Sequence, residues 1–87
     1  MKYELIKTDI STERVIFQEI IGENNETQKI PTDEYEVDIT IGLKHIDNFI
    51  PPFSKTITVK SNNSQTGFEV DIQRQQEVEN YLNLINQ

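Results

Sequence analysis

The sequence predicts an α+β fold, a largely antiparallel sheet of four to five strands with one amphipathic C-terminal helix packed on one face. Two observations lead to this prediction. Short runs rich in β-branched and aromatic residues, separated by turn-forming residues, fill the chain as far as residue 73. The residues after that repeat apolar side chains at helical spacing instead. Closure of the sheet into a small barrel is the alternative that this pattern leaves open.

The clearest strand covers residues 35–41, where apolar and polar residues alternate strictly. This alternation predicts one buried face and one face in contact with water. Pro31 is expected before this strand or at its edge, because proline cannot donate to a β-ladder. Gly42 is expected to interrupt the alternation, with a bulge that carries Leu43 onward. The inward residues are Tyr35, Val37, Ile39 and Ile41, and the outward residues are Glu34, Glu36, Asp38 and Thr40.

Two further strands are expected earlier in the chain. Residues 2–10 form the first, and a turn follows at residues 9–13. Residues 14–21 admit two interpretations, because their β-branched residues favour a strand while Ile16 and Ile20 also have helical spacing. We favour the strand, since Gly22 and the polar residues after it are typical of a hairpin loop.

Two more strands, residues 55–60 and 68–73, are predicted to form an antiparallel hairpin across the polar turn at residues 61–67. Before them, residues 45–53 contain two adjacent prolines and form a stiff connection. Its four large apolar residues either cover the core, the favoured interpretation, or form a rigid exposed tongue that docks into a partner. These residues are Ile46, Phe49, Ile50 and Phe53.

The C-terminal helix is expected to be about three turns long and to depend on packing for its stability. Its apolar stripe has spacing i, i+3, i+4 and i+7, with polar residues on the remaining surface. Covering one face of the sheet is the simplest way to bury this stripe. The stripe consists of Val78, Tyr81, Leu82 and Ile85.

Length and charge restrict the classes of partner. The chain has 87 residues, which predicts a single domain over residues 1–87. Its formal net charge of -7 repels nucleic-acid phosphates and anionic membranes, so we expect neither as a partner. A protein with a basic surface is compatible with this charge. The absence of cysteine and of a signal-peptide pattern favours a cytoplasmic location.

Catalytic and metal-binding signatures are lacking in the sequence. The one histidine, His45, has Asp47 nearby but no further ligand at a fixed spacing, so we interpret it as a loop residue at the end of a strand. No phosphate-binding glycine loop, nucleophile elbow or calcium loop occurs. We therefore expect a protein that is not an enzyme and that holds no cofactor or metal.

The carboxylates of residues 34–38 are the most distinctive surface feature. On a strand, Glu34, Glu36 and Asp38 line up about 7 Å apart on the outward face, which is close to the phosphate spacing of a nucleic-acid strand. Glu69 and Asp71 would extend this face from the predicted last strand. The face is interpreted as a solvated surface, as a docking surface for a protein, or as a mimic of nucleic acid.

Together these features predict a small non-enzymatic protein-binding module, a regulator or inhibitor that docks through its acidic sheet face. The bias toward Asn, Ile, Lys and Glu is typical of AT-rich bacterial genomes and of their phages or plasmids. The alternatives are a nucleic-acid-mimicking inhibitor and a structural subunit of a phage or other assembly, in which a sheet edge pairs with a second copy. The predicted partner-binding residues are Glu34, Glu36, Asp38, Glu69, Asp71, Phe49 and Phe53.

Overall fold

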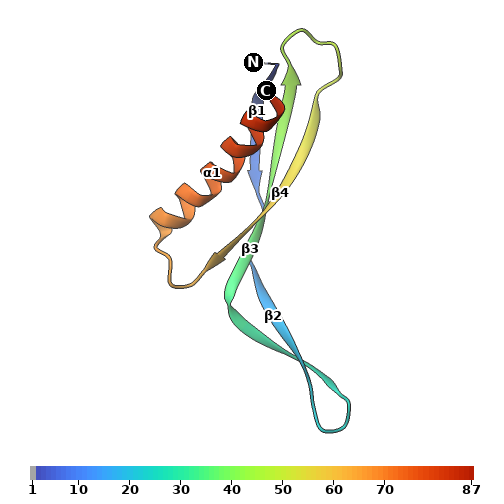
Figure 1. The fold of residues 1–87 in the computed structure, drawn as a ribbon, viewed down its shortest axis with the longest axis vertical. Helices are drawn as coiled ribbons and strands as arrows, with labels where there is room; N and C mark the ends of the chain where they lie inside the picture. Colours follow the sequence, from blue (N-terminus) through green and yellow to red (C-terminus); the bar gives the residue numbers. More distant parts are fainter. Residues whose placement is uncertain (1) are drawn as a thin grey trace.

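The computed structural model describes residues 2–87, and within them the chain forms four strands and one helix (Figure 1). All strand pairs are antiparallel, so the predicted α+β fold is confirmed; the sheet is open and not closed into a barrel. The elements are β1 (Tyr3–Ile10), β2 (Arg14–Ile21), β3 (Thr27–His45), β4 (Phe53–Asn62) and α1 (Gly67–Ile85).

Strand β3 organises the sheet, because it pairs with each of the other three strands. Its C-terminal part pairs with β1, from Ile39 to His45, and its N-terminal part pairs with β2, from Thr27 to Glu36. Strand β4 pairs with the middle of β3 and overlaps both of these stretches. Since each residue of β3 has one neighbour on each side, β1 and β2 lie one after the other along one edge of β3, and β4 lies along the other edge.

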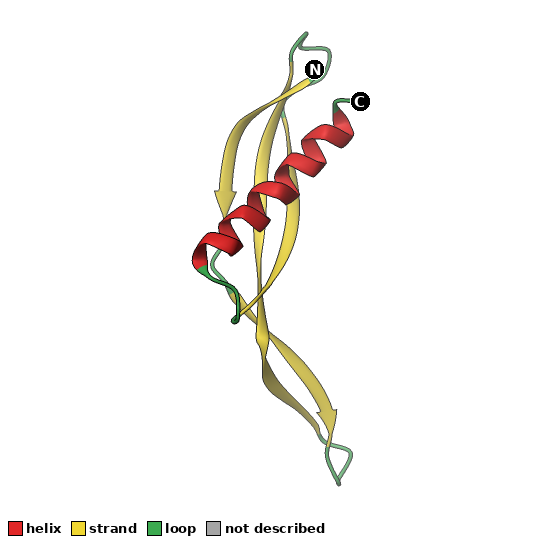
Figure 2. Ribbon diagram, turned by 60° about the vertical axis from the view of Figure 1, so that its left-hand side comes forward, coloured by secondary structure: helices red, strands yellow, loops and turns green. Residues whose placement is uncertain are grey.

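The molecule therefore has a body and an arm. The body contains β1, β4, α1 and the C-terminal part of β3, whereas the arm is the twisted two-stranded ribbon of residues 14–34. Figures 1 and 2 show the arm projecting away from the helix, and the molecule measures 60 × 29 × 22 Å. Helix α1 covers one face of the body and does not extend over the arm (Figure 2).

The core of the body lies between β3, β4 and α1. The inward residues of β3 are buried together with Val59 of β4, and the predicted apolar stripe of α1 packs against them. The alternation predicted for β3 is thereby confirmed, and the predicted inward residue Tyr35 is half-buried at the base of the arm. The buried residues of this core are Val37, Ile39, Ile41, Leu43 and Val59.

The predicted bulge at Gly42 is wrong, because the bulge lies in the neighbouring strand β1 and not in β3. Alternation in β3 continues through Gly42 to the buried Leu43, and the register shift lies in β1, between Leu5 and Lys7. A Cβ atom at Gly42 would lie 3.3 Å from the Cβ of Lys7. The glycine thus gives the bulged strand room to approach β3.

The prediction of a strand at residues 68–73, paired with residues 55–60, is also wrong, because α1 begins at Gly67 and is 19 residues long. Thr66 and Glu69 form a capping box: Thr66 Oγ1 accepts a hydrogen bond from the Glu69 N–H, and a Glu69 carboxylate oxygen accepts one from the Thr66 N–H. This cap fixes the start of the helix about two turns before the expected position. The length of about three turns predicted for the helix is corrected accordingly.

The remaining elements have the predicted type, strand or loop, but not always the predicted length. Residues 14–21 form a strand, so the helical alternative is excluded, and residues 22–26 form the hairpin loop. Strand β3 begins before Pro31 and runs past Leu43, so it is much longer than the predicted segment. Pro31 itself lies within β3, opposite Phe17, in the part where β3 has β2 as its one partner.

Candidate docking surfaces

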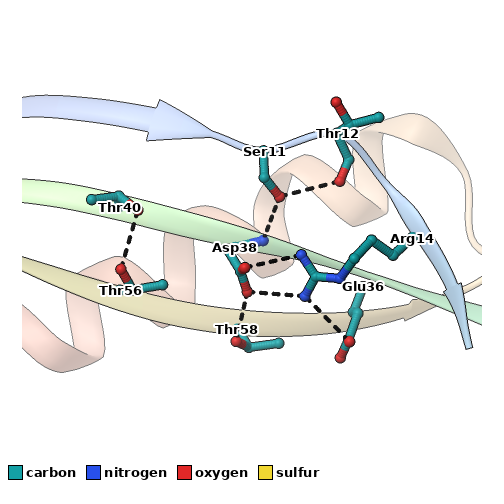
Figure 3. Close-up of polar contacts among 8 residues, drawn as sticks. All are labelled: Ser11, Thr12, Arg14, Glu36, Asp38, Thr40, Thr56 and Thr58. Atoms are coloured by element: carbon teal, nitrogen blue, oxygen red, sulfur yellow. Dashed lines mark hydrogen bonds and ion pairs between the residues drawn. The ribbon is translucent and has the colours of Figure 1, made fainter.

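The face of the sheet opposite α1 carries a cluster of polar side chains around Asp38 (Figure 3). Arg14 of β2 donates two hydrogen bonds to the Asp38 carboxylate, from Nη1 to Oδ2 at 2.9 Å and from Nη2 to Oδ1 at 3.1 Å. The same Nη2 lies 3.2 Å from Oε1 of Glu36. On the other side, Thr58 of β4 donates to Oδ1 of Asp38 at 2.8 Å. One carboxylate therefore ties β2, β3 and β4 together at the base of the arm.

These contacts change the electrostatics of the predicted acidic row. The hydrogen bond from the Arg14 guanidinium, and after it the one from the Thr58 hydroxyl, holds the pKa of Asp38 below its ordinary value. In turn, hydrogen bonds to Asp38 and then to Glu36 raise the pKa of Arg14. Two of the three carboxylates in the row thus share one positive charge, which reduces the negative charge that the row presents to a basic partner.

Replacing Asp38 by asparagine should make folding stability less sensitive to acid. The lowered pKa means that ionised Asp38 stabilises the fold above about pH 4, and that this contribution is lost as the pH falls through the folded-state value. Urea unfolding at several pH values should therefore show a stability difference between wild type and Asp38→Asn that shrinks below about pH 4. Asp71→Asn on the helix surface controls for loss of one charge. A difference for Asp38→Asn that stays constant down to pH 2 would contradict the assignment.

Ser11 continues this cluster and joins β1 to β2. Its N–H donates to the carbonyl oxygen of Asp38 at 2.9 Å, and its Oγ accepts from the N–H of Asp38 at 2.8 Å. Beside it, the hydroxyls of Thr40 and Thr56 lie 3.2 Å apart across the strands. Sequence reasoning identified Ser11 as a turn residue and missed this bridging role, because the partner lies 27 residues further along the chain.

The other predicted acidic residues are not gathered on this face. Glu34 is exposed on β3, where the arm leaves the body. Glu69 and Asp71 belong to α1, and α1 packs on the opposite face of the sheet, so they do not extend the row. Glu69 caps its own helix instead. The predicted five-carboxylate surface is therefore divided between two sides of the molecule.

The two phenylalanines of the proposed tongue have different positions. Phe53 is half-buried at the start of β4, opposite Leu43, and its ring lies edge-on to Tyr3 at a centroid distance of 5.7 Å. Phe49 is 80% exposed in the loop between β3 and β4, and its ring touches His45 at a centroid distance of 5.1 Å. Phe53 therefore belongs to the packed body, and Phe49 remains available at the loop.

The apolar surface of the arm is a feature that the sequence analysis did not predict. Phe17 is 53% exposed and Ile21 is 77% exposed, and by strand alternation both point to the same face of the ribbon. Ile20 and Ile30 lie on the other face and are also exposed. No described element of the chain covers either face. The sequence did contain this signal, since residues 15–21 are apolar on both faces, but it cannot show that no element of the body covers the arm.

The side chain of Thr32 stabilises the base of the arm through two hydrogen bonds. The register between β2 and β3 shifts between Val15 and Phe17, so the chain of β3 bulges at this point. Thr32 fills the bulge: its Oγ1 donates to the carbonyl oxygen of Ile16 at 2.7 Å and accepts from the N–H of Glu34 at 3.1 Å. These two hydrogen bonds replace some of the backbone hydrogen bonds that the bulge removes between β2 and β3. The arm therefore leaves the body through a hydrogen-bonded joint and not through a loop.

A hollow of about 360 Å³ lies between β1 and α1. Its lining is mainly apolar and includes Leu5, Ile10 and Leu82. Arg74 also borders it; its Nη2 lies 3.4 Å from Oε1 of Glu13, and its buried Nε has no hydrogen-bond partner among residues 2–87. This hollow is a second apolar surface, but nothing in the described part of the chain indicates what occupies it.

Residues 2–87 contain no group of three or more His, Asp or Glu side chains placed to hold a metal ion. Within the same residues, no helix combines the length and the apolar character that crossing a membrane requires.

Comparison with known proteins found no family model, no curated protein and no solved structure that matches this chain.

Proposed function

We propose that this chain is a non-enzymatic subunit that docks on a protein through its arm. The observation that carries the proposal is the exposure of Phe17 and Ile21 on one face of a ribbon that no other described element covers. With Ile20 and Ile30 on the other face, four large apolar side chains are exposed on this short ribbon, and such clustering of exposed apolar residues is typical of interaction sites. An isolated two-stranded ribbon is also marginally stable in water, so a partner that covers the arm would stabilise it.

The arm supports an assembly subunit better than a nucleic-acid mimic. A mimic depends on a run of free negative charges, whereas Arg14 is bound to both Glu36 and Asp38. A projecting arm, in contrast, lets one subunit reach over a neighbour while the two bodies stay apart (Figure 1). A role in a phage or other mobile-element assembly, in a cytoplasm that suits a chain without cysteine, is part of this proposal.

The test compares proteins captured from the source cell by wild type and by Phe17→Ser/Ile21→Ser. Recovery of the partner should fall at least about tenfold, because each apolar side chain buried in an interface contributes on the order of 1–2 kcal/mol. Phe68→Ser/Leu84→Ser is the matched control, since it removes two exposed apolar side chains from α1. Circular dichroism checks that all variants fold. Equal recovery by wild type and the arm variant would contradict the proposal.

A further inference from the structure

We propose that β2 is a pairing edge, and that its partner is β2 of a second copy of this chain. The two strands would run antiparallel about a two-fold axis at Gln18 and join the two arms into a four-stranded ribbon. This inference rests on the proposed docking role of the arm and names the partner that the arm takes.

The first argument compares the free edges of the sheet. Soluble proteins protect exposed strand edges with lysine, proline or bulges, because an unprotected edge pairs with other chains. Strand β1 carries Lys7 and a bulge, and β4 carries Lys55 and Lys60. The edge of β3 that β4 leaves free, residues 27–32, carries Lys29 and Pro31.

Strand β2 has none of these protections. It contains no lysine, proline or glycine, and five of its eight residues are β-branched or aromatic. Its two charged residues are Arg14, which is bound to Glu36 and Asp38 at the base of the arm, and Glu19. Among residues 2–87, no strand other than β3 pairs with β2, so its outer edge is open.

The second argument is electrostatic and concerns the place where a second copy can approach. The chain carries a net charge of -7, so two copies repel each other over most of their surface. Strand β2, however, contains one arginine and one glutamate and has no net charge. Pairing here also keeps the acidic bodies apart, because the arms extend away from them (Figures 1 and 2).

The third argument is the register around Gln18. With Gln18 opposite Gln18 of the second copy, Val15 lies beside Ile21 and Ile16 beside Ile20. Apolar residues then meet on both faces of the four-stranded ribbon, which is the favourable arrangement for cross-strand pairs. Each Glu19 faces Phe17 of the other copy, so no like charges lie directly opposite.

Cross-linking tests this register directly, because the natural chain has no cysteine. Gln18→Cys places two thiols opposite each other across the two-fold axis, within the Cα separation that a disulfide requires. Mild oxidation should therefore give a covalent dimer. Gln28→Cys is the matched control, since Gln28 lies opposite Ile20 on the same face of the arm, but on β3. In the four-stranded ribbon, its two copies would lie three strand spacings apart across the ribbon and four residues apart along it, which is about 20 Å and too far to cross-link.

A charge exchange tests the pairing without a covalent bond. Gln18→Lys and Gln18→Glu each place two like charges at the axis, so each variant alone should sediment as a monomer at concentrations where wild type is a dimer. Mixing the two variants should restore a heterodimer. Circular dichroism of each variant checks the fold.

Three outcomes would overturn the inference: a wild-type protein that stays monomeric at high concentration, cross-linking of Gln28→Cys in place of Gln18→Cys, or failure of the mixed variants to associate. These outcomes are distinct from failure of the proposed function. If Phe17→Ser/Ile21→Ser loses a captured protein while wild type stays monomeric, the arm docks on a different protein and the self-pairing alone is excluded. Equal capture by that variant would exclude the docking role itself.

Discussion

Replacing Ile41 by alanine is expected to lower the free energy of unfolding by about 2–5 kcal/mol. Ile41 is 0% exposed, at the centre of the β3 row that packs against β4 and α1. Removing three carbon atoms there loses the free energy gained when these atoms move from water into the core. It also leaves a cavity that a pleated strand cannot close. Urea denaturation followed by circular dichroism gives the midpoint and the slope from which the change is obtained.

The matched control for this substitution is Ile6→Ala in β1. Ile6 lies at the bulge and is 53% exposed, so the same change of side chain should cost less than about 1 kcal/mol there. The comparison separates burial from the loss of β-propensity, since both positions exchange the same residues within a strand. Equal losses at the two positions would show that β3 does not form the core of the body.

Replacing Glu77 by proline is expected to destabilise the protein by about 3 kcal/mol or more. Glu77 is exposed in the middle of α1, where proline removes a backbone hydrogen bond and collides with the preceding turn. The kink would lift Val78 and Tyr81 from the sheet and expose the core beneath them. Domains of this kind are stable by about 5–15 kcal/mol in total, so the thermal midpoint should fall markedly or folding should be lost.

Gly67→Pro provides the control, because Gly67 is the first helical residue after the cap Thr66. Proline is accepted at this position, since its missing N–H has no partner within the helix. The extended backbone of Thr66, with ψ of 161°, also suits a residue before proline. A Cβ at Gly67 meets no atom within 4 Å. We expect Gly67→Pro to melt within a few degrees of wild type; a loss as large as that of Glu77→Pro would place Gly67 outside the first turn.

The body was predictable because its signals are local and long. The strict alternation before Gly42 specifies a strand with one buried face, and the stripe from Val78 to Ile85 specifies a helix that needs that face. Residues 68–73 were mispredicted because Phe68, Val70 and Ile72 match strand alternation over a length too short to separate the two periods. The capping box of Thr66 and Glu69 is the stronger signal, because its spacing predicts a helix that begins at Gly67.

The docking surfaces were less predictable because they depend on pairing between distant segments. The sequence places Glu36 and Asp38 on the outward face of β3, and the structure confirms that placement. It does not reveal that Arg14, more than 20 residues earlier, binds both carboxylates. A salt bridge of this kind depends on strand register, and register is set by the whole sheet.

The sequence by itself determined that this protein has an antiparallel sheet, a covering helix, a net negative charge and no catalytic motif. Only the tertiary structure decided that β1 and β2 share one edge of β3, and that β4 ends where the arm begins. Because β4 and α1 reach no further, the apolar residues of the arm have no partner within the described chain. Local patterns specify which residues require burial, but the arrangement of the strands decides which of them remain exposed.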